Sequence, residues 1–373
     1  MTSDRIGLAV VGCGAIGRIR AVLARETVAV DWLGLCDIDE RVARSLAADT
    51  DAQFVTTDFR ELLARPEVTA VIIATDENEH VEPILTAVEL GVPLFIEKPL
   101  AADLADSARM LKAIEDNDID AVIGYTQRFR RRFRTVKQRL RDGQIGEVTS
   151  VVTRAFMNRM VPMSTLVKTD RKDNLTPMVV SDTHSLDMCM WLMEGKTPVE
   201  VYARSVDTVL HDIGTKDATF GLFTMDDGTL WSMNISWALP TVWPGAVYGL
   251  EIGIVGTRGV IDIEDTHRDV IVASEIPQPI SHRHTDRGFE PEVARHVDFI
   301  GSYPPGDVSD GLLWGPMREE TLTWFNRLTK GGHTPHATAA DGHRNLMLTM
   351  AMDLSASRGT PVLLPLKAGE PLV

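Results

Sequence analysis

The stretch that decides the fold lies near the N-terminus and reads Ile6-Gly-Leu-Ala-Val-Val-Gly12-Cys-Gly14-Ala-Ile-Gly17. Its glycines form the pattern G-x-G-x-x-G between an apolar run and a helix-like stretch. In such a turn Gly12 permits the tight bend, Gly14 lets backbone N–H groups approach a pyrophosphate, and Gly17 lets the helix pack closely on the strand. The pattern predicts a dinucleotide-binding turn formed by Gly12, Gly14, Ala15, Ile16 and Gly17.

An acidic residue supports this interpretation and bears on the choice of cofactor. Asp37 follows Gly17 by twenty positions, at the end of the second expected strand, where a carboxylate can bind the ribose 2′-hydroxyl. Asp37 would repel a 2′-phosphate and Ile38 offers it no donor, so the sequence favours NAD over NADP. Asp39 is a second candidate for the ribose contact, and its alternative role is the N-cap of the next helix.

Around this turn, residues 6–124 alternate strand-like runs with helix-like stretches. The run Ala70–Ala74 is apolar throughout, as expected for a strand that is covered on both faces. The alternation predicts an α/β domain with a doubly wound parallel (Rossmann) sheet. The expected strands are Ile6–Val11, Val30–Cys36, Gln53–Thr56, Ala70–Ala74, Pro93–Ile96 and Ala121–Gly124, and the expected helices are Ala15–Glu26, Glu40–Ala48, Phe59–Ala64, Glu79–Leu90 and Leu104–Asn117.

The pattern changes after about residue 125, where strand-like runs follow one another through short Gly- and Asp-rich turns. We expect strands at 148–155, 199–210, 218–223, 230–237, 248–255, 259–263 and 270–273, and helices at 131–142, 182–194, 289–301, 317–329 and 338–357. This predicts a C-terminal α+β domain with a large, open, mostly antiparallel sheet. The expected domains are therefore a nucleotide-binding domain at 1–124 and a substrate-binding and oligomerisation domain at 125–373.

Composition excludes several classes of partner. The chain has 373 residues and a formal net charge of −15, so neither nucleic acid nor a membrane surface is an expected partner. Its three cysteines, Cys13, Cys36 and Cys189, have no paired metal-binding spacing, and no metal site is expected. The odd cysteine count and the lack of a signal-peptide or membrane-spanning pattern predict a cytoplasmic location.

Further motifs give the chain a resemblance to a known family. Glu97-Lys98-Pro99 directly follows the fifth expected strand, and with the glycine turn it resembles the GFO/IDH/MocA family, the glucose-fructose oxidoreductase and inositol dehydrogenase group. Supporting segments occur along nearly the whole chain: Ala74–His80, Gly124–Phe129, Gly143–Glu147, Thr183–Asp187, Ala340–Gly342 and Gly359–Pro365.

The resemblance implies hydride transfer between a nicotinamide cofactor and a secondary alcohol of a sugar, glycoside or cyclitol. It implies that Lys98 and His184 are catalytic and that the Lys98–Pro99 peptide bond is cis. The chemistry of the residue types agrees. A carbinol that loses a hydride must also lose its hydroxyl proton, which a histidine can accept near neutral pH. An ammonium group stabilises the negative charge that develops on the oxygen.

One position departs from the family pattern. The family usually carries an aspartate four residues before the histidine, and here that position is Val180, which cannot orient an imidazole or share its proton. Asp182 is a candidate replacement, and its alternative role is the N-cap of the helix that follows. Asp187 lies one helical turn after His184, on the same face, and is a candidate to bind the imidazole or a substrate hydroxyl.

The remaining candidate residues line the expected cofactor and substrate sites. Thr75, Asn78, His80 and Glu97, together with Lys98, are expected in the cofactor cleft at the ends of the fourth and fifth strands. The expected substrate-binding residues are Lys98, Tyr125, Arg128, Arg154, Asp187 and Trp237. Trp237 can stack on a sugar ring, although a core position is the alternative role for it.

The sequence leaves three functions open. The first is an NAD-dependent dehydrogenase that acts on a polyhydroxyl substrate. The second is an enzyme that retains NAD and uses transient oxidation to cleave or epimerise a glycoside. The third is a regulatory protein that binds NAD without catalysis. The open sheet would expose a broad face, so a homodimer or homotetramer is also expected.

Overall fold

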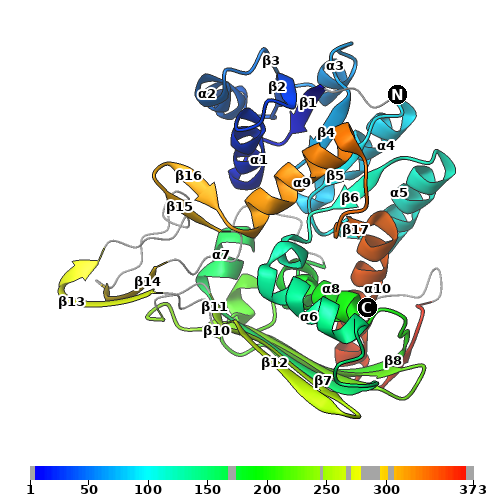
Figure 1. Cartoon of the computed structure of the whole chain (residues 1–373). Helices are drawn as coiled ribbons and strands as arrows, with labels where there is room; N and C mark the ends of the chain where they lie inside the picture. The colour runs from blue at the N-terminus through cyan, green and yellow to red at the C-terminus, as the bar shows by residue number, and fades with distance from the viewer. Residues whose placement is uncertain are drawn as a thin grey trace. The chain divides into compact units, whose positions relative to one another are not determined.

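The computed structural model describes residues 5–166, 174–243, 247–265, 270–278, 295–300 and 306–366 (Figure 1). The chain divides into two compact units, which are described separately. Unit 1 comprises Met1–Phe129 and Val308–Leu346, and unit 2 comprises Arg130–Asp307 and Met347–Val373. The chain therefore passes between the units three times.

Unit 1 is built on a seven-stranded sheet with the order β17-β6-β5-β4-β1-β2-β3. Six strands are parallel, and β17 joins the edge antiparallel to β6. The strand order reverses between β1 and β4, which confirms the predicted doubly wound sheet. The strands are β1 (Ile6–Val11), β2 (Val30–Cys36), β3 (Phe54–Thr56), β4 (Ala70–Ile73), β5 (Leu94–Ile96), β6 (Ala121–Ile123) and β17 (Ala337–Thr338).

The helices of unit 1 begin where the local sequence places caps. Asp39, Asp58 and Asp103 each accept a first-turn backbone N–H, at the starts of α2, α3 and α5. By contrast, α1 begins after Gly14, which has no side chain to cap it, so its first-turn amides are available to a ligand. The helices are α1 (Ala15–Arg25), α2 (Glu40–Thr50), α3 (Phe59–Leu63), α4 (Val81–Glu89), α5 (Leu104–Asp116) and α9 (Pro316–Lys330), with 3₁₀ turns η1 (Glu77–Glu79) and η2 (Thr126–Phe129).

The C-terminal part of the chain contributes to unit 1. Trp324 and Phe325 of α9 are at most 1% exposed and pack in the same core as Leu8 and Val10 of β1. The predicted boundary at 124 lies near the end of the first segment of unit 1, but residues 308–346 belong to this unit rather than to the C-terminal domain. The apolar pattern of a helix shows that one face is buried, but it does not show which sheet buries that face.

Unit 2 is built on a second seven-stranded sheet, with the order β12-β11-β7-β10-β9-β8-β18. All neighbouring strands are antiparallel except β7 and β10, so the predicted mostly antiparallel sheet is confirmed. The strands are β7 (Val148–Asn158), β8 (Pro198–Val206), β9 (Ala218–Met225), β10 (Leu230–Leu239), β11 (Val247–Gly256), β12 (Gly259–Asp265) and β18 (Val362–Leu363). Two small two-stranded sheets pair β13 (Val270–Gln278) with β14 (Arg295–Ile300) in unit 2, and β15 (Asp307–Ser309) with β16 (Leu312–Trp314), which lie almost entirely in unit 1.

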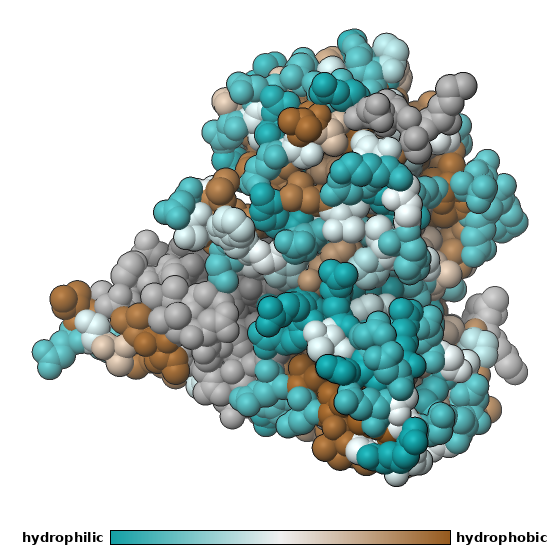
Figure 2. Space-filling view, viewed as in Figure 1, coloured by the Kyte–Doolittle hydropathy of each residue, from teal (hydrophilic) through white to brown (hydrophobic). Residues whose placement is uncertain are grey.

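Helices cover one face of this sheet and leave the other face open. Phe133 and Leu186 pack in one core with Val151 and Ala155 of β7. Figure 2 shows hydrophobic atoms at the lower edge of the molecule, where Figure 1 draws β7 and β12. The helices are α6 (Arg131–Arg141), α7 (Met160–Leu166), α8 (Thr183–Leu192) and α10 (Ala339–Arg358), which begins in unit 1, with the π-helix η3 (Met178–Asp182) and the 3₁₀ turn η4 (His211–Ile213).

One expected helix is a strand. The sequence predicted a helix at 289–301, but residues 295–300 form β14 and pair with β13; the rest of that range lies outside the described residues. A short amphipathic run is ambiguous between the two conformations, and pairing with β13 decides this one. No helix in the described part of the chain has the length and apolar character that a membrane span requires.

Candidate functional site

The glycine turn of unit 1 has the backbone that the sequence predicts. Gly12 has φ +93°, and a Cβ there would overlap the carbonyl group of Ala74. A Cβ at Gly17 would overlap the carbonyl oxygen of Gly12, so α1 packs against the turn without room for a side chain. Around Gly14, by contrast, a Cβ would meet nothing within 4 Å. The open space at Gly14 therefore lies where a ligand can approach the start of α1.

Asp37 braces this turn from the end of β2. Its carboxylate accepts the backbone N–H of Cys13 at 2.8 Å and that of Asp39 at 2.9 Å. Asp39 has its alternative role: its side chain accepts the N–H of Arg41 and caps α2. Arg41 is solvent-exposed and paired with Asp39, as expected for the outer side of the helix. Asp37 is therefore the better placed of the two aspartates for the ribose contact.

A cavity of about 570 Å³ opens beside the glycine turn, and it brings several predicted cofactor residues together. Those that line it are Gly12, Gly14, Asp37, Thr75 and Asn78. Other lining residues were not expected from the sequence, and they come from the loop before α3, from α3, from η1 and from α4: Thr57, Phe59, Arg60, Glu79 and Glu82. Their position after the third and fourth parallel strands is the signal that could have identified them, because ligands bind at the carboxyl ends of such strands.

The predicted cofactor residues Ala15, Ile16, Gly17 and His80 do not line this cavity. Ala15, Ile16 and Gly17 form the first turn of α1, where helical amides face the turn. His80 is 1% exposed, and its Nε2 lies 3.1 Å from the carbonyl oxygen of Thr75. His80 therefore supports the loop that carries Thr75 rather than lining the cavity itself.

Lys98 follows β5 in a buried segment. It is the one side chain between Leu94 and Ala102 that is not buried, and the Lys98–Pro99 bond is cis, as the resemblance implied. Glu97 is 8% exposed and its carboxylate binds Arg20 of α1. A Cβ at Gly124 would lie 2.8 Å from the Glu97 carboxylate, which explains the glycine there. The segment thus holds Glu97 inside and leaves Lys98 partly exposed.

His184 stands in the first turn of α8 in unit 2. Of residues 181–190 it is the one that is not buried. The turn before it is the π-helix η3, which contains both Val180, at the position of the family aspartate, and Asp182. Single π turns inside helices are frequent at functional sites, because the extra residue changes the direction in which side chains point. The π turn contains the position at which this sequence departs from the pattern of the family it resembles.

Asp182 does not cap α8, which corrects one of its two expected roles. Its backbone is already helical and its side chain makes no capping hydrogen bond. The side chain is fully buried, and burial raises the pKa of Asp182 to about 7, although a hydrogen bond from Ser185 opposes the shift. Burial also raises the pKa of the Cys189 thiol, and the nearby carboxylates of Asp182 and Asp187 add to that shift. Asp182 is therefore an acid that can gain or lose a proton at neutral pH.

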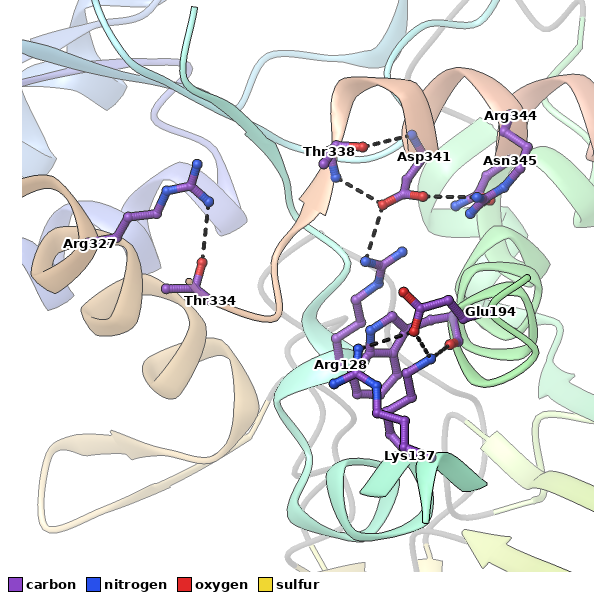
Figure 3. Close-up of polar contacts among 11 residues, drawn as sticks. Arg128, Lys137, Glu194, Arg327, Thr334, Thr338, Asp341, Arg344 and Asn345 are labelled. Carbon is purple, nitrogen blue, oxygen red and sulfur yellow. Dashed lines mark hydrogen bonds and ion pairs between the residues drawn. The ribbon is translucent and has the colours of Figure 1, made fainter. Parts of the chain in front are cut away.

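Arg128 and Tyr125 are buried in unit 1, 3% and 1% exposed respectively. Arg128 pairs with Asp341 at 3.2 Å, and Asp341 also pairs with Arg344 and accepts the N–H of Thr338 (Figure 3). Burial tends to raise the pKa of Asp341, but Arg128 and Arg344 hold it below its usual value. These contacts give Arg128 a structural role at the start of α10.

Two predicted substrate residues are corrected by the structure. Arg154 pairs with Glu251 on the open face of the sheet, whereas its neighbours Val151 and Ala155 face the core that contains α8. Trp237 is fully buried in that core, where its Nε1 donates to the Ser181 hydroxyl at 2.9 Å. Arg154 therefore points away from His184, and Trp237 supports the π turn instead of stacking on a sugar. Lys168, which is also basic, lies outside the described residues.

The residues of the cavity fit a dinucleotide. The uncapped first turn of α1 and the open position at Gly14 suit a pyrophosphate, and the Asp37 carboxylate suits a ribose hydroxyl. Phe59 and Arg60, in cation–π contact, also line the cavity and provide a flat surface for a base. The segment after the neighbouring strand β5 carries Lys98, two residues beyond the end of that strand.

Comparison with protein families agrees with this geometry. The model of the GFO/IDH/MocA oxidoreductase family with an NAD-binding Rossmann fold matches residues 6–144. The model of the GFO/IDH/MocA C-terminal domain matches residues 133–262. Together the two matches cover the six parallel strands of the Rossmann sheet and most of the second sheet.

Curated relatives extend the likeness over most of the chain. An inositol 2-dehydrogenase of Acidothermus cellulolyticus is 30% identical over 330 residues, which cover 84% of this chain and 87% of that protein. A myo-inositol 2-dehydrogenase of Thermotoga maritima is 25% identical over 352 residues, covering 93% and 94%. An inositol 2-dehydrogenase of Gluconacetobacter diazotrophicus is 33% identical over a shorter match, 51% of this chain and 55% of that protein.

Solved structures share the fold. A probable dehydrogenase from Thermotoga maritima superposes with a TM-score of 0.76 at 21% identity, over 96% of this chain and 99% of that one. A scyllo-inositol dehydrogenase from Lactobacillus casei, solved with NAD(H) and scyllo-inositol, superposes with a TM-score of 0.75 at 19% identity, over 96% and 99%.

Proposed function

The chain belongs to the GFO/IDH/MocA family of NAD-binding oxidoreductases, and we propose that it oxidises a ring secondary alcohol of an inositol-like cyclitol, with Lys98 and His184 as its catalytic residues. It is a dehydrogenase that acts on a CH–OH group of a sugar or cyclitol. We narrow the substrate class to cyclitols because two relatives that match over most of their length are named inositol dehydrogenases.

The proposal rests on the burial of the residues around Lys98 in unit 1 and around His184 in unit 2. Lys98 and His184 are each the accessible residue of an otherwise buried segment, so the fold presents one ammonium and one imidazole while it fixes their surroundings. Burial of the flanking residues limits the motion of the backbone that carries each group. Precise placement of this kind is what catalysis by a fixed acid–base group requires.

Lys98 has an electrostatic role in the proposal. When the C–H bond of the carbinol breaks, negative charge develops on its oxygen, and a nearby ammonium stabilises that charge. When bound, NAD would supply the hydride acceptor, and Gly12, Gly14, Asp37, Thr75 and Asn78 would hold it in the cavity of unit 1.

His184 accepts the hydroxyl proton in the proposal. An imidazole ordinarily titrates near neutral pH, which suits a general base. Asp182 is buried three residues before Ser185 and seven before Cys189, so it lies on their face of the helix and not on the face of His184. Asp182 therefore acts indirectly, as a buried acid that titrates at neutral pH, and Asp187 shares the face of His184 and is placed to orient it.

The test is an assay of purified protein with NAD and a panel of inositol isomers, glucose, glucosides and acyclic polyols. We expect stoichiometric NADH with at least one inositol and a much lower rate with the acyclic polyols, since a rigid ring presents one carbinol geometry. A substrate deuterated at the reacting carbon should transfer deuterium to the cofactor. NAD binding without NADH formation from any member of the panel would contradict the proposed function.

Two further properties belong to the same proposal. We infer a homodimer or homotetramer, because the open face of the unit 2 sheet exposes Val152, Phe220 and Leu222, 55%, 47% and 42% exposed respectively. We infer a cytoplasmic location, because all three cysteines are buried and unpaired. Light scattering and cell fractionation test these two statements.

A further inference from the structure

A fully buried arginine in unit 1 has no part in the mechanism above. Arg20 lies on α1, three residues after the last glycine of the turn, and is 0% exposed. Its guanidinium lies 4.2 Å from the centroid of the Phe95 ring. A charged side chain in such a position is costly unless its hydrogen bonds are satisfied. Its partners therefore indicate what it does.

Arg20 holds two carboxylates from distant parts of the chain. Its Nε donates to Glu97 at 2.9 Å, and its Nη2 lies 2.8 Å from Glu97 and 2.7 Å from Glu320 of α9. Its Nη1 donates to the Thr321 hydroxyl and to the Met317 carbonyl oxygen. The planar guanidinium can satisfy several acceptors at fixed angles, which an ammonium group cannot.

The partner that matters for the reaction is Glu97, because it is joined by one peptide bond to Lys98. Glu97 also donates its backbone N–H to the carbonyl oxygen of Ile73 at 2.9 Å. Its side chain and main chain are thus both held, while Lys98 projects from the next position. A shift of Glu97 would move the backbone that carries the ammonium.

We propose that Arg20 is a positioning residue, which clamps Glu97 and α9 together and thereby fixes the backbone of the Glu97-Lys98-Pro99 turn. This inference rests on the proposed function, in which Lys98 is catalytic. The clamp acts within unit 1, since α1, the end of β5 and α9 all belong to that unit. It also gives the returning segment 308–346 a functional purpose, because α9 supplies the second carboxylate.

The contacts of Glu320 hold both its carboxylate and its backbone in one position, as the proposed clamp requires. The Thr126 hydroxyl donates to Glu320 at 2.9 Å, and His336 approaches the Glu320 backbone carbonyl at 3.1 Å with Nε2. Burial raises the pKa of Glu320 to about 7; Arg20 opposes this shift and Glu97 adds to it. Arg20, Glu97 and Thr126 are the groups of the described part of unit 1 that act on this carboxylate, and His336 contacts only the backbone carbonyl of Glu320.

The test is the conservative variant Arg20→Lys, which keeps the positive charge but loses the planar guanidinium that binds both carboxylates. We expect faster amide hydrogen exchange in the segment 97–102 of the protein without NAD, because Glu97 is no longer held from two sides. We expect kcat to fall roughly 10- to 100-fold, since small displacements of a catalytic group have effects of this size. The KM for the polyol and the Kd for NAD should change by less than about threefold, because the residues of the cavity are untouched.

Arg327→Lys is the matched control. Arg327 also lies on α9 in unit 1 and makes a bidentate pair, but with Asp120, so Glu97 is not involved. We expect this variant to have a lower melting temperature than the wild type, while amide hydrogen exchange in segment 97–102 and kcat stay unchanged. If Arg20→Lys does not fold, the double variant Arg20→Gln/Glu320→Gln removes one cation and one carboxylate together, and the same changes are expected in it.

The outcomes separate the two proposals. Unchanged exchange in segment 97–102, or unchanged kcat per folded molecule, overturns the positioning role of Arg20. A loss of NAD affinity parallel to the loss of kcat also overturns it, because Arg20 would then act through the glycine turn. If the wild-type protein oxidises no polyol, the proposed function fails, and the exchange measurement alone decides whether Arg20 fixes the turn.

Discussion

Lys98 and His184 share one local property: each is the accessible residue of a segment whose other members are buried. The motif around Lys98 was readable from sequence, because Glu97-Lys98-Pro99 directly follows an apolar strand. The burial of Asp182 was not, since its neighbours in sequence do not form a regular apolar pattern. A buried acid two residues before a partly exposed histidine is a feature that the fold, and not the local sequence, produces.

Replacement of Lys98 tests the electrostatic part of the mechanism. We expect Lys98→Met to lower kcat for polyol oxidation by roughly 10²–10³, the usual effect of removing one charge-stabilising donor. Lys112→Met is the control, because Lys112 is an exposed lysine of the same unit that pairs with Asp116. Steady-state NADH formation and an NAD titration measure both effects. Turnover that survives Lys98→Met would remove this residue from the mechanism.

Asp182→Asn should separate stability from activity. The folded pKa of Asp182 is raised to about 7 from its usual 3.8, so the wild type loses stability as pH rises from about 4 to about 7. Asparagine does not ionise, so the free energy of unfolding of the variant should not fall in this way. Between about pH 4 and about pH 8, the variant should therefore gain stability relative to the wild type by on the order of 2–4 kcal/mol. We expect kcat to fall at neutral pH at the same time. Denaturant melts across this pH range and steady-state rates provide the measurement.

The control for this prediction is Asp227→Asn. The hydrogen bond from Lys196, together with one from the backbone of Thr229, lowers the pKa of Asp227 to about 2, and its side chain is largely exposed. Its titration window therefore lies below about 4, and the stability difference from the wild type should be constant between about pH 5 and 8. If the stability difference between Asp182→Asn and the wild type does not change with pH, or changes no more than that of Asp227→Asn, Asp182 is not the buried acid described.

At the scale of the elements, the parallel sheet was predictable and the π turn was not. Buried strands such as Ala70–Ile73 have no polar residue, and their apolar runs alone indicate them. The segment before His184 instead contains Leu175, Thr176 and Pro177, which define no period. Trp237 is buried in the core and donates a hydrogen bond to the Ser181 hydroxyl, and this contact favours the π conformation there. Tertiary contacts of this kind cannot be read from local spacing.

The strand–turn–helix element at the N-terminus gives a sharp test of NAD binding. A Cβ at Gly14 would meet nothing within 4 Å and the backbone φ is −63°, so Gly14→Ala should leave the melting temperature unchanged. The added methyl occupies the approach to the first turn of α1, and we expect the Kd for NAD to rise about tenfold or more, since the backbone must come close to the pyrophosphate. Calorimetry of both proteins measures this.

Gly253→Ala provides the comparison for this change. Gly253 lies on β11 in unit 2, where a Cβ would make an ordinary contact with Asp262 at 3.7 Å, and it does not line the cofactor cavity. The same added methyl should therefore leave NAD affinity as it is. Equal NAD affinity in Gly14→Ala and the wild type would show that the pyrophosphate does not approach Gly14.

At the scale of the whole molecule, the path of the chain was the least predictable feature. The helix near 317–329 was expected, but its membership of unit 1 depends on Trp324 and Phe325 packing beneath β1. Arg154 shows the same limit within a sheet: alternation along β7 places it on one of two faces, and the sequence does not say which face carries the helices. Long-range packing settles both questions.

The open face of the unit 2 sheet leads to the last prediction, which concerns assembly. Phe220 lies on this face, where it stacks with Phe156, and both line a groove next to Arg154 and Glu251. In a two-fold symmetric interface each residue of the patch occurs twice, so one substitution introduces two buried charges. We expect Phe220→Glu to convert the oligomer to a monomer in light-scattering measurements.

Val28→Glu, which places the same charge on an isolated exposed valine of unit 1, should leave the mass unchanged. A wild type that is already monomeric at micromolar concentration, or a Phe220→Glu protein of unaltered mass, would show that this face is not the interface.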